Sequence, residues 1–230
     1  MSLILQIDTA SDNAHVSLAK NGQLLHWLSN ESQKKHAAFL QAGIQQLIKN
    51  TNINLKDIDA VAVTAGPGSY TGLRVGMASA KGLCYALKKP LITIGTLEVL
   101  TASALQLFPT DNKDLLYCPM MDARRMEVFT AIYKHDLSIH LQPCAMILDE
   151  LSFETELMNN QIVFFGSGSD KWKHICPDSY REKHAIFKTV SISPKSLGTS
   201  SNALFSENKF TELAYSEPVY LKEFQTVINS

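Results

Sequence analysis

The sequence from Thr64 to Ala86, TAGPGSYTGLRVGMASAKGLCYA, decides how the rest of the chain is interpreted. It follows IDAVAV (residues 58–63), a short apolar run that is typical of a buried strand. Gly66-Pro67-Gly68 predicts a tight reversal, because glycine adopts positive φ and proline fixes its own φ. Ser69 is then placed to cap a helix by accepting a hydrogen bond from a backbone N–H. The stretch therefore predicts a buried strand, a glycine turn and a helix.

Small residues recur at every fourth position of this predicted helix: Gly72, Gly76, Ala80 and Cys84. A glycine inside a helix costs roughly 1 kcal/mol relative to alanine. A chain usually keeps such a glycine where another backbone comes close. Two interpretations stay open: the helix packs closely on this chain's own sheet, or part of its surface meets a helix of another protein.

The composition is that of an ordinary globular protein. The chain has 230 residues, of which 45% are hydrophobic and 19% charged, which suits one large domain or two small ones. A net charge of -1 argues against a chain that binds nucleic acid unaided, because phosphate binding needs clustered Lys and Arg. The four cysteines form no C-x-x-C pair and are expected to be reduced thiols. With no signal peptide or membrane span in the sequence, we expect a cytoplasmic protein.

The order of apolar runs predicts two similar α/β lobes. Residues 1–108 are predicted as β-β-β-α-β-α-β-α, with a hairpin at Asn21-Gly22 and helices over 35–49 and 70–86. Residues 109–230 begin with the same β-β-β-α-β pattern, so they are predicted as a second, reduced lobe, and the C-terminal tail is a candidate to return to the first lobe. The first strand of each half ends at an aspartate, Asp8 or Asp122. A duplicated pattern of this kind is found in the actin-like and sugar-kinase-like ATPases.

Three short segments have the form of the loops that surround the nucleotide in that fold class. They are IDTA (residues 7–10), MDAR (121–124) and Gly166-Ser167-Gly168. Asp8, Thr9 and Asp122 are accordingly the candidates for nucleotide contact, with a structural role as the alternative for each. Because the second lobe is short, a complete ATP site within this chain is not expected.

Catalytic residues and metal ligands are not predicted. None of the seven histidines forms an H-x-x-x-H pair, the spacing that places two ligands on one face of a helix. Ser69 lies where a nucleophile elbow would lie, but GPGSYTG lacks the G-x-S-x-G spacing. We interpret Ser69 as a helix cap.

Five segments together resemble one family, the bacterial TsaB proteins, which are also called YeaZ. The segments are LILQIDTA (3–10), AGPGSYTGLRVGMASAKGL (65–83), TLEVL (96–100), MDARRMEVF (121–129) and EPVYLK (217–222). They occur in the family's order and span nearly the whole chain. Two departures are a missing proline in HAAFLQAG (36–43) and Tyr70 where phenylalanine is common.

The resemblance implies an α/β, two-lobed fold of the actin-like, Hsp70-like and sugar-kinase-like ATPases, with duplicated ribonuclease-H-like lobes of which the second is degenerate. It also implies a non-catalytic subunit needed to form the threonylcarbamoyl group on N6 of adenosine 37, in tRNAs that read codons beginning with A. TsaD, a larger relative with an H-x-x-x-H motif, would perform the transfer as heterodimer partner, and the ATPase TsaE would join. ATP or ADP and metal are expected on TsaD, TsaE or shared interfaces, with none bound firmly by this chain alone. This chain would contact tRNA only indirectly, through the complex. When TsaD is absent, a homodimer of this chain is the alternative.

The two helices over 35–49 and 70–86 are predicted to meet two equivalent helices of TsaD. The predicted interface, some of which must face this chain's own sheet, consists of Leu40, Ile44, Leu47, Gly72, Val75, Gly76, Ala80 and Leu83. The competing interpretations are a catalytically active ATPase of the actin-like fold, a peptidase-like protein, and a purely structural dimer.

Overall fold

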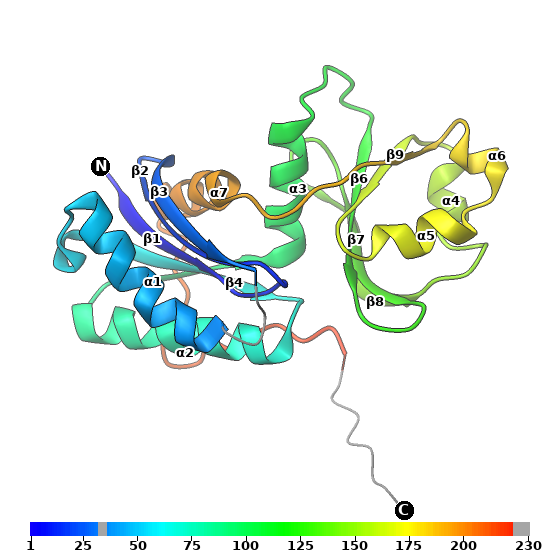
Figure 1. The fold of residues 1–230 in the computed structure, drawn as a ribbon. Coiled ribbons are helices and arrows are strands. Elements are labelled where there is room, and N and C mark those ends of the chain that lie inside the picture. The colour runs from blue at the N-terminus through cyan, green and yellow to red at the C-terminus, as the bar shows by residue number, and fades with distance from the viewer. Residues whose placement is uncertain (32–35, 223–230) are drawn as a thin grey trace, which may run out of the picture.

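The chain folds into two α/β lobes, each built on a five-stranded sheet (Figure 1). The structure is a computed structural model, and it describes residues 1–31 and 36–222. The strand order is β3-β2-β1-β4-β5 in the first sheet and β8-β7-β6-β9-β10 in the second, so the two orders correspond strand by strand. In each sheet the first three strands pair antiparallel and the last two join in parallel. The predicted duplicated α/β fold is therefore confirmed.

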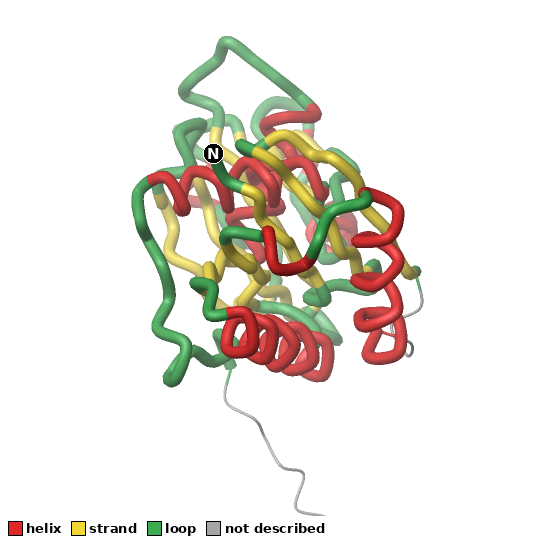
Figure 2. The backbone as a smooth tube through the Cα atoms, turned by 90° about the vertical axis from the view of Figure 1, so that its left-hand side faces the viewer, coloured by secondary structure: helices red, strands yellow, loops and turns green. Residues whose placement is uncertain are grey.

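Helices cover both faces of the first sheet (Figures 1 and 2). Its strands are β1 (Leu3–Asp8), β2 (Ala14–Lys20), β3 (Gln23–Asn30), β4 (Ala60–Gly66) and β5 (Leu91–Gly95). One face carries α1 (His36–Thr51) and α2 (Tyr70–Leu87), the other carries α3 (Thr96–Leu107) and α7 (Pro194–Ser206), and a short 3-10 turn, η2 (Leu55–Asp57), precedes β4. Lys35, in the predicted first helix, lies outside the described residues. Among the described helices none is long and apolar enough to cross a membrane.

The main core of the first lobe lies between the sheet and the helices α1 and α2. Its buried side chains include Leu5, Ile7, Val16, Leu40, Leu47, Val63 and Met77. Strand β4 is buried at all seven positions, as its uninterrupted apolar sequence predicts for a central strand. Because burial of each large aliphatic side chain contributes about 1.5–3 kcal/mol, this layer fixes how α1 and α2 sit on the sheet.

The second lobe is smaller and has short helices. Its strands are β6 (Leu116–Asp122), β7 (Glu127–Tyr133), β8 (Ile139–Ile147), β9 (Ile162–Phe165) and β10 (Ala185–Phe187). Its helices are α4 (Glu154–Leu157), α5 (Ser169–Ile175) and α6 (Asp178–Arg181). Trp172 is wholly buried on α5 and packs edge-on against Phe153, with ring centroids 5.5 Å apart. Aromatic packing of this kind gives the lobe a core of its own.

The last part of the chain lies on the first lobe. Helix α7 buries Leu197 against Ile4 and Ala62 of the first sheet, and Thr211 bridges to Leu91 of β5. The sequence analysis assigned residues 109–230 to the second lobe, with the C-terminal tail as a candidate to return to the first, and in the structure the part that lies on the first lobe begins at α7. The physical reason is that the apolar side of α7 is buried against the face of the first sheet that also carries α3 (Figure 1).

Candidate functional site

The glycines of the decisive stretch make room for specific backbone groups of this chain. A Cβ atom on Gly68 would collide with the carbonyl oxygen of Ala10, and one on Gly72 with that of Thr9. A Cβ on Gly66 would collide with the carbonyl oxygen of Val219. Gly66 and Gly68 also have φ of +123° and +158°, which other residues rarely adopt. For these positions the structure therefore supports the first interpretation, close packing within the chain.

The loop after β1 is held against the start of α2. Ser69 caps the helix, because its Oγ accepts a hydrogen bond from Gly72 N at 3.3 Å. Its backbone N donates to Ala10 O at 2.7 Å, and the Thr9 hydroxyl donates to Gly72 O at 2.7 Å. The glycine turn thus serves to join α2 to the end of β1.

Asp8 and Thr9, two of the three candidates for nucleotide contact, are wholly buried and bonded within the first lobe. Asp8 Oδ1 accepts from the Thr64 hydroxyl at 2.6 Å and from Ala10 N at 3.1 Å. Its Oδ2 lies 3.5 Å from His15 Nδ1. Since both candidates have 0% exposure, neither presents a free group to a phosphate in this conformation.

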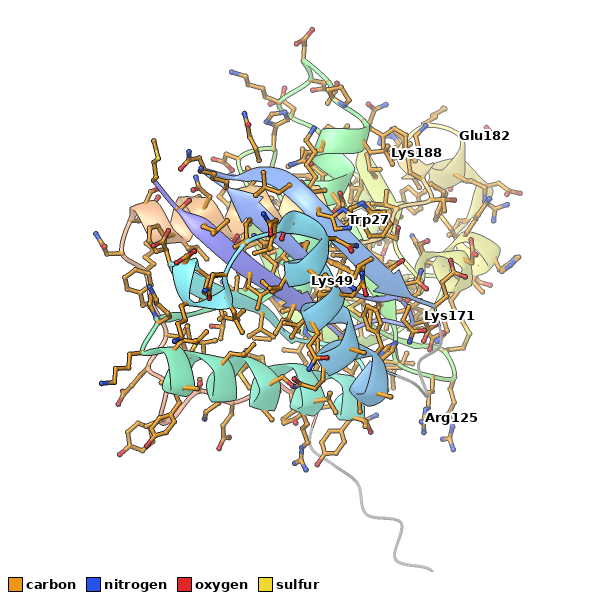
Figure 3. The ribbon with its side chains drawn as sticks, turned by 60° about the vertical axis from the view of Figure 1, so that its left-hand side comes forward. Trp27, Lys49, Arg125, Lys171, Glu182 and Lys188 are labelled. Carbon is orange, nitrogen blue, oxygen red and sulfur yellow. The ribbon has the colours of Figure 1, made fainter. Side chains whose placement is uncertain are left out.

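Asp122, the third candidate, is exposed and lies in a small polar cluster of the second lobe. Its Oδ2 is 3.0 Å from Lys171 Nζ, and its backbone N donates a hydrogen bond to Ser167 Oγ at 3.1 Å. The structure thus brings together two of the three predicted loop segments. Lys171 and Arg125 lie at the same end of the lobe (Figure 3). Lys171 was missed by the sequence analysis, because only the fold brings α5 beside the β6–β7 turn.

Six of the eight predicted interface residues are buried in this chain's own core: Leu40, Ile44, Leu47, Gly72, Gly76 and Ala80. Their contacts are with the first sheet and the loop after β1, so in this conformation they are covered by the chain itself. These six are therefore the members of the predicted set that face this chain's own sheet, and their contact with a partner stays a prediction. Val75 and Leu83 are half-buried at the edge of the same core.

Part of the solvent-exposed side of α1 and α2 forms a surface of uncharged side chains, four of them alanine or glycine, which we call the α1–α2 face. It consists of Ala38, Gln41, Ala42, Gln45, Ala78, Gly82 and Tyr85. Gln41 Nε2 donates to Ser79 Oγ at 3.4 Å, which ties the two helices together. Gly82 is the notable member, because a Cβ built on it meets no atom within 4 Å. No contact within the described chain accounts for a glycine at this position.

The segment of residues 211–222, which we call the C-terminal segment, runs along the side of α2. Lys81 Nζ donates to the carbonyl oxygens of Ala214 and Ser216 at 3.1 and 3.0 Å. Arg74 Nε donates to the Tyr220 hydroxyl at 3.1 Å. Two aromatic side chains beside the contact between α2 and the C-terminal segment, Tyr85 and Tyr215, are each 81% exposed. The segment therefore adds the exposed side chain of Tyr215 to the surface around the α1–α2 face.

The segment also reaches the second lobe. Val219 N donates to Ala65 O at 2.7 Å, and Lys222 Nζ lies 2.8 Å from Glu127 Oε2. Arg74 packs 4.2 Å from the centre of the Tyr70 ring, which itself lies 5.2 Å from that of Tyr220. These contacts place EPVYLK, one of the segments of the family resemblance, across both lobes.

The cysteines do not offer an activated nucleophile. Burial raises the pKa of Cys84 to about 11, and burial also raises the pKa of Cys118, which has no exposed surface. A thiol in such surroundings stays protonated at neutral pH and is unreactive. In residues 1–31 and 36–222, no group of three or more His, Cys, Asp or Glu side chains is arranged to hold a metal ion.

Comparison with known proteins relates this architecture to one family. The family model described as "TsaD: tRNA N6-adenosine threonylcarbamoyltransferase" matches residues 29–229. The TsaB protein of Escherichia coli is 27% identical over 227 residues, 95% of this chain and 94% of that protein. The TsaB protein of Bacillus subtilis is 26% identical over 196 residues, 84% of this chain and 82% of that one. YeaZ from Pseudomonas aeruginosa has the same fold, with a TM-score of 0.77 at 20% identity over 96% of this chain and all of that one. The chain belongs to the family of TsaD, tRNA N6-adenosine threonylcarbamoyltransferase, and its resemblance to TsaB (YeaZ) is confirmed.

Proposed function

We propose that this chain acts in tRNA threonylcarbamoyladenosine biosynthesis as a non-catalytic subunit that pairs with TsaD. The role in this pathway rests on the TsaB relatives, which the chain matches over most of their length. TsaD would transfer the threonylcarbamoyl group to N6 of adenosine 37, and TsaE would join the pair. With a net charge of -1, this chain would meet tRNA through the complex and not alone.

The observation that carries the proposal is Gly82 on the α1–α2 face. It lies in the interior of α2, where glycine costs roughly 1 kcal/mol relative to alanine, and nothing in the described chain crowds it. A helix of a partner that crosses α2 here could approach closely, toward the lower end of the usual range of about 8–10 Å between axes. The alanines at positions 38, 42 and 78 are the other small side chains of this face.

Exposed tyrosines supply the second support. A stable heterodimer buries on the order of 1,600 Å² in total, and a few large aromatic side chains usually carry most of its binding energy. Tyr85 in the α1–α2 face and Tyr215 beside it are both exposed and are the natural anchors. When TsaD is absent, the same surface would be covered in a homodimer.

The buried state of Asp8 and Thr9 bears on where the nucleotide binds. Because both side chains are bonded inside the first lobe, we place ATP or ADP and metal on TsaD, on TsaE or at interfaces shared with them. Asp122 is exposed beside Lys171 and is the residue of this chain best placed to contribute to such a shared site.

Reconstitution of the reaction tests the proposal. Purified TsaD, TsaE, threonylcarbamoyl-adenylate and tRNA are incubated with and without this chain, and modified adenosine is quantified. We expect product to depend on this chain and to be absent when this chain is the only protein. Equal product without the chain would contradict the proposal, and product from the chain alone would show that it is itself the catalyst.

A further inference from the structure

The turn between β6 and β7, residues 123–126, contains two consecutive arginines in a backbone conformation that arginine rarely adopts. Arg124 has a φ of +71° and Arg125 a φ of +48°. Positive φ is uncommon for residues other than glycine, and asparagine, aspartate and histidine are the ones enriched there. Among residues 1–31 and 36–222, these two are the only consecutive non-glycine residues with positive φ. The sequence of this turn is therefore at odds with its backbone.

The turn between β2 and β3 shows the usual choice of residues for consecutive positive φ. Asn21 and Gly22 have φ of +50° and +78°, and both residue types adopt such angles readily. Residues held in unfavourable conformations cluster at binding sites, where the surrounding structure maintains them. The contrast within one chain indicates that positions 124 and 125 are kept for their side chains and not for the turn.

The β6–β7 turn is held in place by its neighbours. Asp122 Oδ1 accepts a hydrogen bond from the backbone N of Arg124 at 2.6 Å, and its Oδ2 lies 3.0 Å from Lys171 Nζ. On the other side of the turn, Glu127 N donates to Arg124 O at 3.1 Å, and Glu127 Oε2 lies 2.8 Å from Lys222 Nζ. The carboxylates that flank the turn are thus paired with lysines from α5 and from the C-terminal segment.

The two arginine side chains are left without a partner. Both are exposed, and they form no hydrogen bond, ion pair or ring contact with the part of the chain that the structure describes. Arg125 projects from the end of the second lobe (Figure 3). Residues 32–35 and 223–230 contain one acidic side chain, Glu223, so at most one carboxylate beyond the described residues could pair with either arginine. A guanidinium group presents a planar fork of N–H donors that matches a phosphate.

The shape of the turn suits an extended anion better than a small one. Cavities of 570 and 480 Å³ lie elsewhere in the described structure, and no residue of the turn lines either one. A small nucleotide would leave its base in solvent here, because small-molecule sites are concave and mostly apolar. A phosphodiester backbone needs no cavity, since successive phosphates are bound from outside by arginine side chains.

We propose that Arg124 and Arg125 bind the phosphodiester backbone of tRNA within the complex with TsaD. This inference rests on the function proposed above, because two phosphate contacts are too few for stable tRNA binding by this chain alone. The turn belongs to the second lobe and lies outside the α1–α2 face, so the proposed contact with TsaD does not use it. Phosphate contacts fix the position of a nucleic acid and carry no sequence information, so the arginines would position tRNA for the transfer that TsaD performs.

The double variant Arg124→Asn/Arg125→Gly tests the proposal, because it gives this turn the residues of the β2–β3 turn. The Tm should stay the same or rise, since these residues suit the backbone better. Calorimetric titration should show unchanged binding to TsaD. In the reconstituted reaction, the KM for tRNA should rise about tenfold at physiological salt while kcat is unchanged. The slope of log KM against log salt concentration should fall by about 1 for each lost phosphate contact.

Two further variants separate the turn from general effects of charge. Lys113→Gln/Lys134→Gln removes two exposed positive charges at the opposite end of the same strand pair, where β6 begins and β7 ends. It should leave the KM for tRNA unchanged. Arg124→Lys/Arg125→Lys keeps both charges and should retain most of the salt dependence, although a lysine lacks the planar fork of arginine.

Three results would overturn the proposal. The first is an unchanged KM for tRNA in the folded double variant Arg124→Asn/Arg125→Gly. The second is a lowered Tm of this variant, because the arginines would then be kept for the turn. The third is weaker binding to TsaD, because they would then contact protein. If the proposed function itself fails, product forms equally well without this chain and both proposals fall. Failure of this inference alone leaves product dependent on the chain and insensitive to the double variant.

Discussion

Gly82→Leu should abolish association with TsaD while the chain stays folded. Leucine is a better helix former than glycine, and a side chain at this exposed position meets no atom of this chain, so α2 is expected to gain stability. The same side chain would hold a partner helix away from α2 and open the packed centre of the interface. Loss of a well-packed centre costs about 3 kcal/mol or more, which corresponds to a more than 100-fold weaker dissociation constant. Calorimetric titration with TsaD measures the change.

Two variants serve as controls for this prediction. Gly82→Ala adds a single methyl group and should bind within about tenfold of the unaltered chain. Ala203→Leu places the same bulky side chain at an exposed position of α7, on the opposite side of the first sheet, and should bind normally. If Gly82→Leu binds TsaD as tightly as Ala203→Leu does, the α1–α2 face is not the interface.

Gly76→Leu should destabilise the fold itself. A Cβ at this position would collide with Thr9 Oγ1, which donates a hydrogen bond to Gly72 O. Overpacking costs about 1–3 kcal/mol, and loss of a buried hydrogen bond adds about 1 kcal/mol more. A total of about 3 kcal/mol should lower the Tm by roughly 10 °C in a chain of this size.

Thermal unfolding followed by circular dichroism measures this effect. Gly82→Leu is the matched control, because it places the same side chain on the same helix in open space. If Gly76→Leu and Gly82→Leu have equal Tm values, the loop after β1 moves to accommodate the leucine side chain without loss of stability, and the prediction is wrong. The contrast separates glycines kept for the fold from the glycine that we assign to a partner.

The sequence pattern predicted the strands of both lobes well, because a short apolar run or an alternation of apolar and polar residues is typical of a strand. The uninterrupted run that became β4, the Asn21-Gly22 hairpin and the Ser69 cap all depend on local chemistry. Helix α7 likewise begins at a local signal, with Ser193 as its cap and Pro194 in its first turn. The lobe that it packs on could not be predicted, since an apolar helix face does not specify which sheet covers it.

The partner-facing residues were the hardest to predict, for a related reason. Small residues at every fourth position on α2 are equally suitable for this chain's own loop and for a foreign helix. Only the position of Thr9 in space shows that Gly72 and Gly76 belong to the first case, and Gly82, which meets no atom of this chain, is the glycine that we propose for the second. In the second lobe, α4, α5, α6 and β10 span only three to seven residues each, too few for a period to be recognised.

Amide hydrogen exchange of this chain, with and without TsaD, tests the central claim most directly. The account predicts that TsaD slows exchange in α1, α2 and the C-terminal segment, and leaves β8 and α6 of the second lobe unchanged. Protection confined to the second lobe, with α1 and α2 unaffected, would contradict the account.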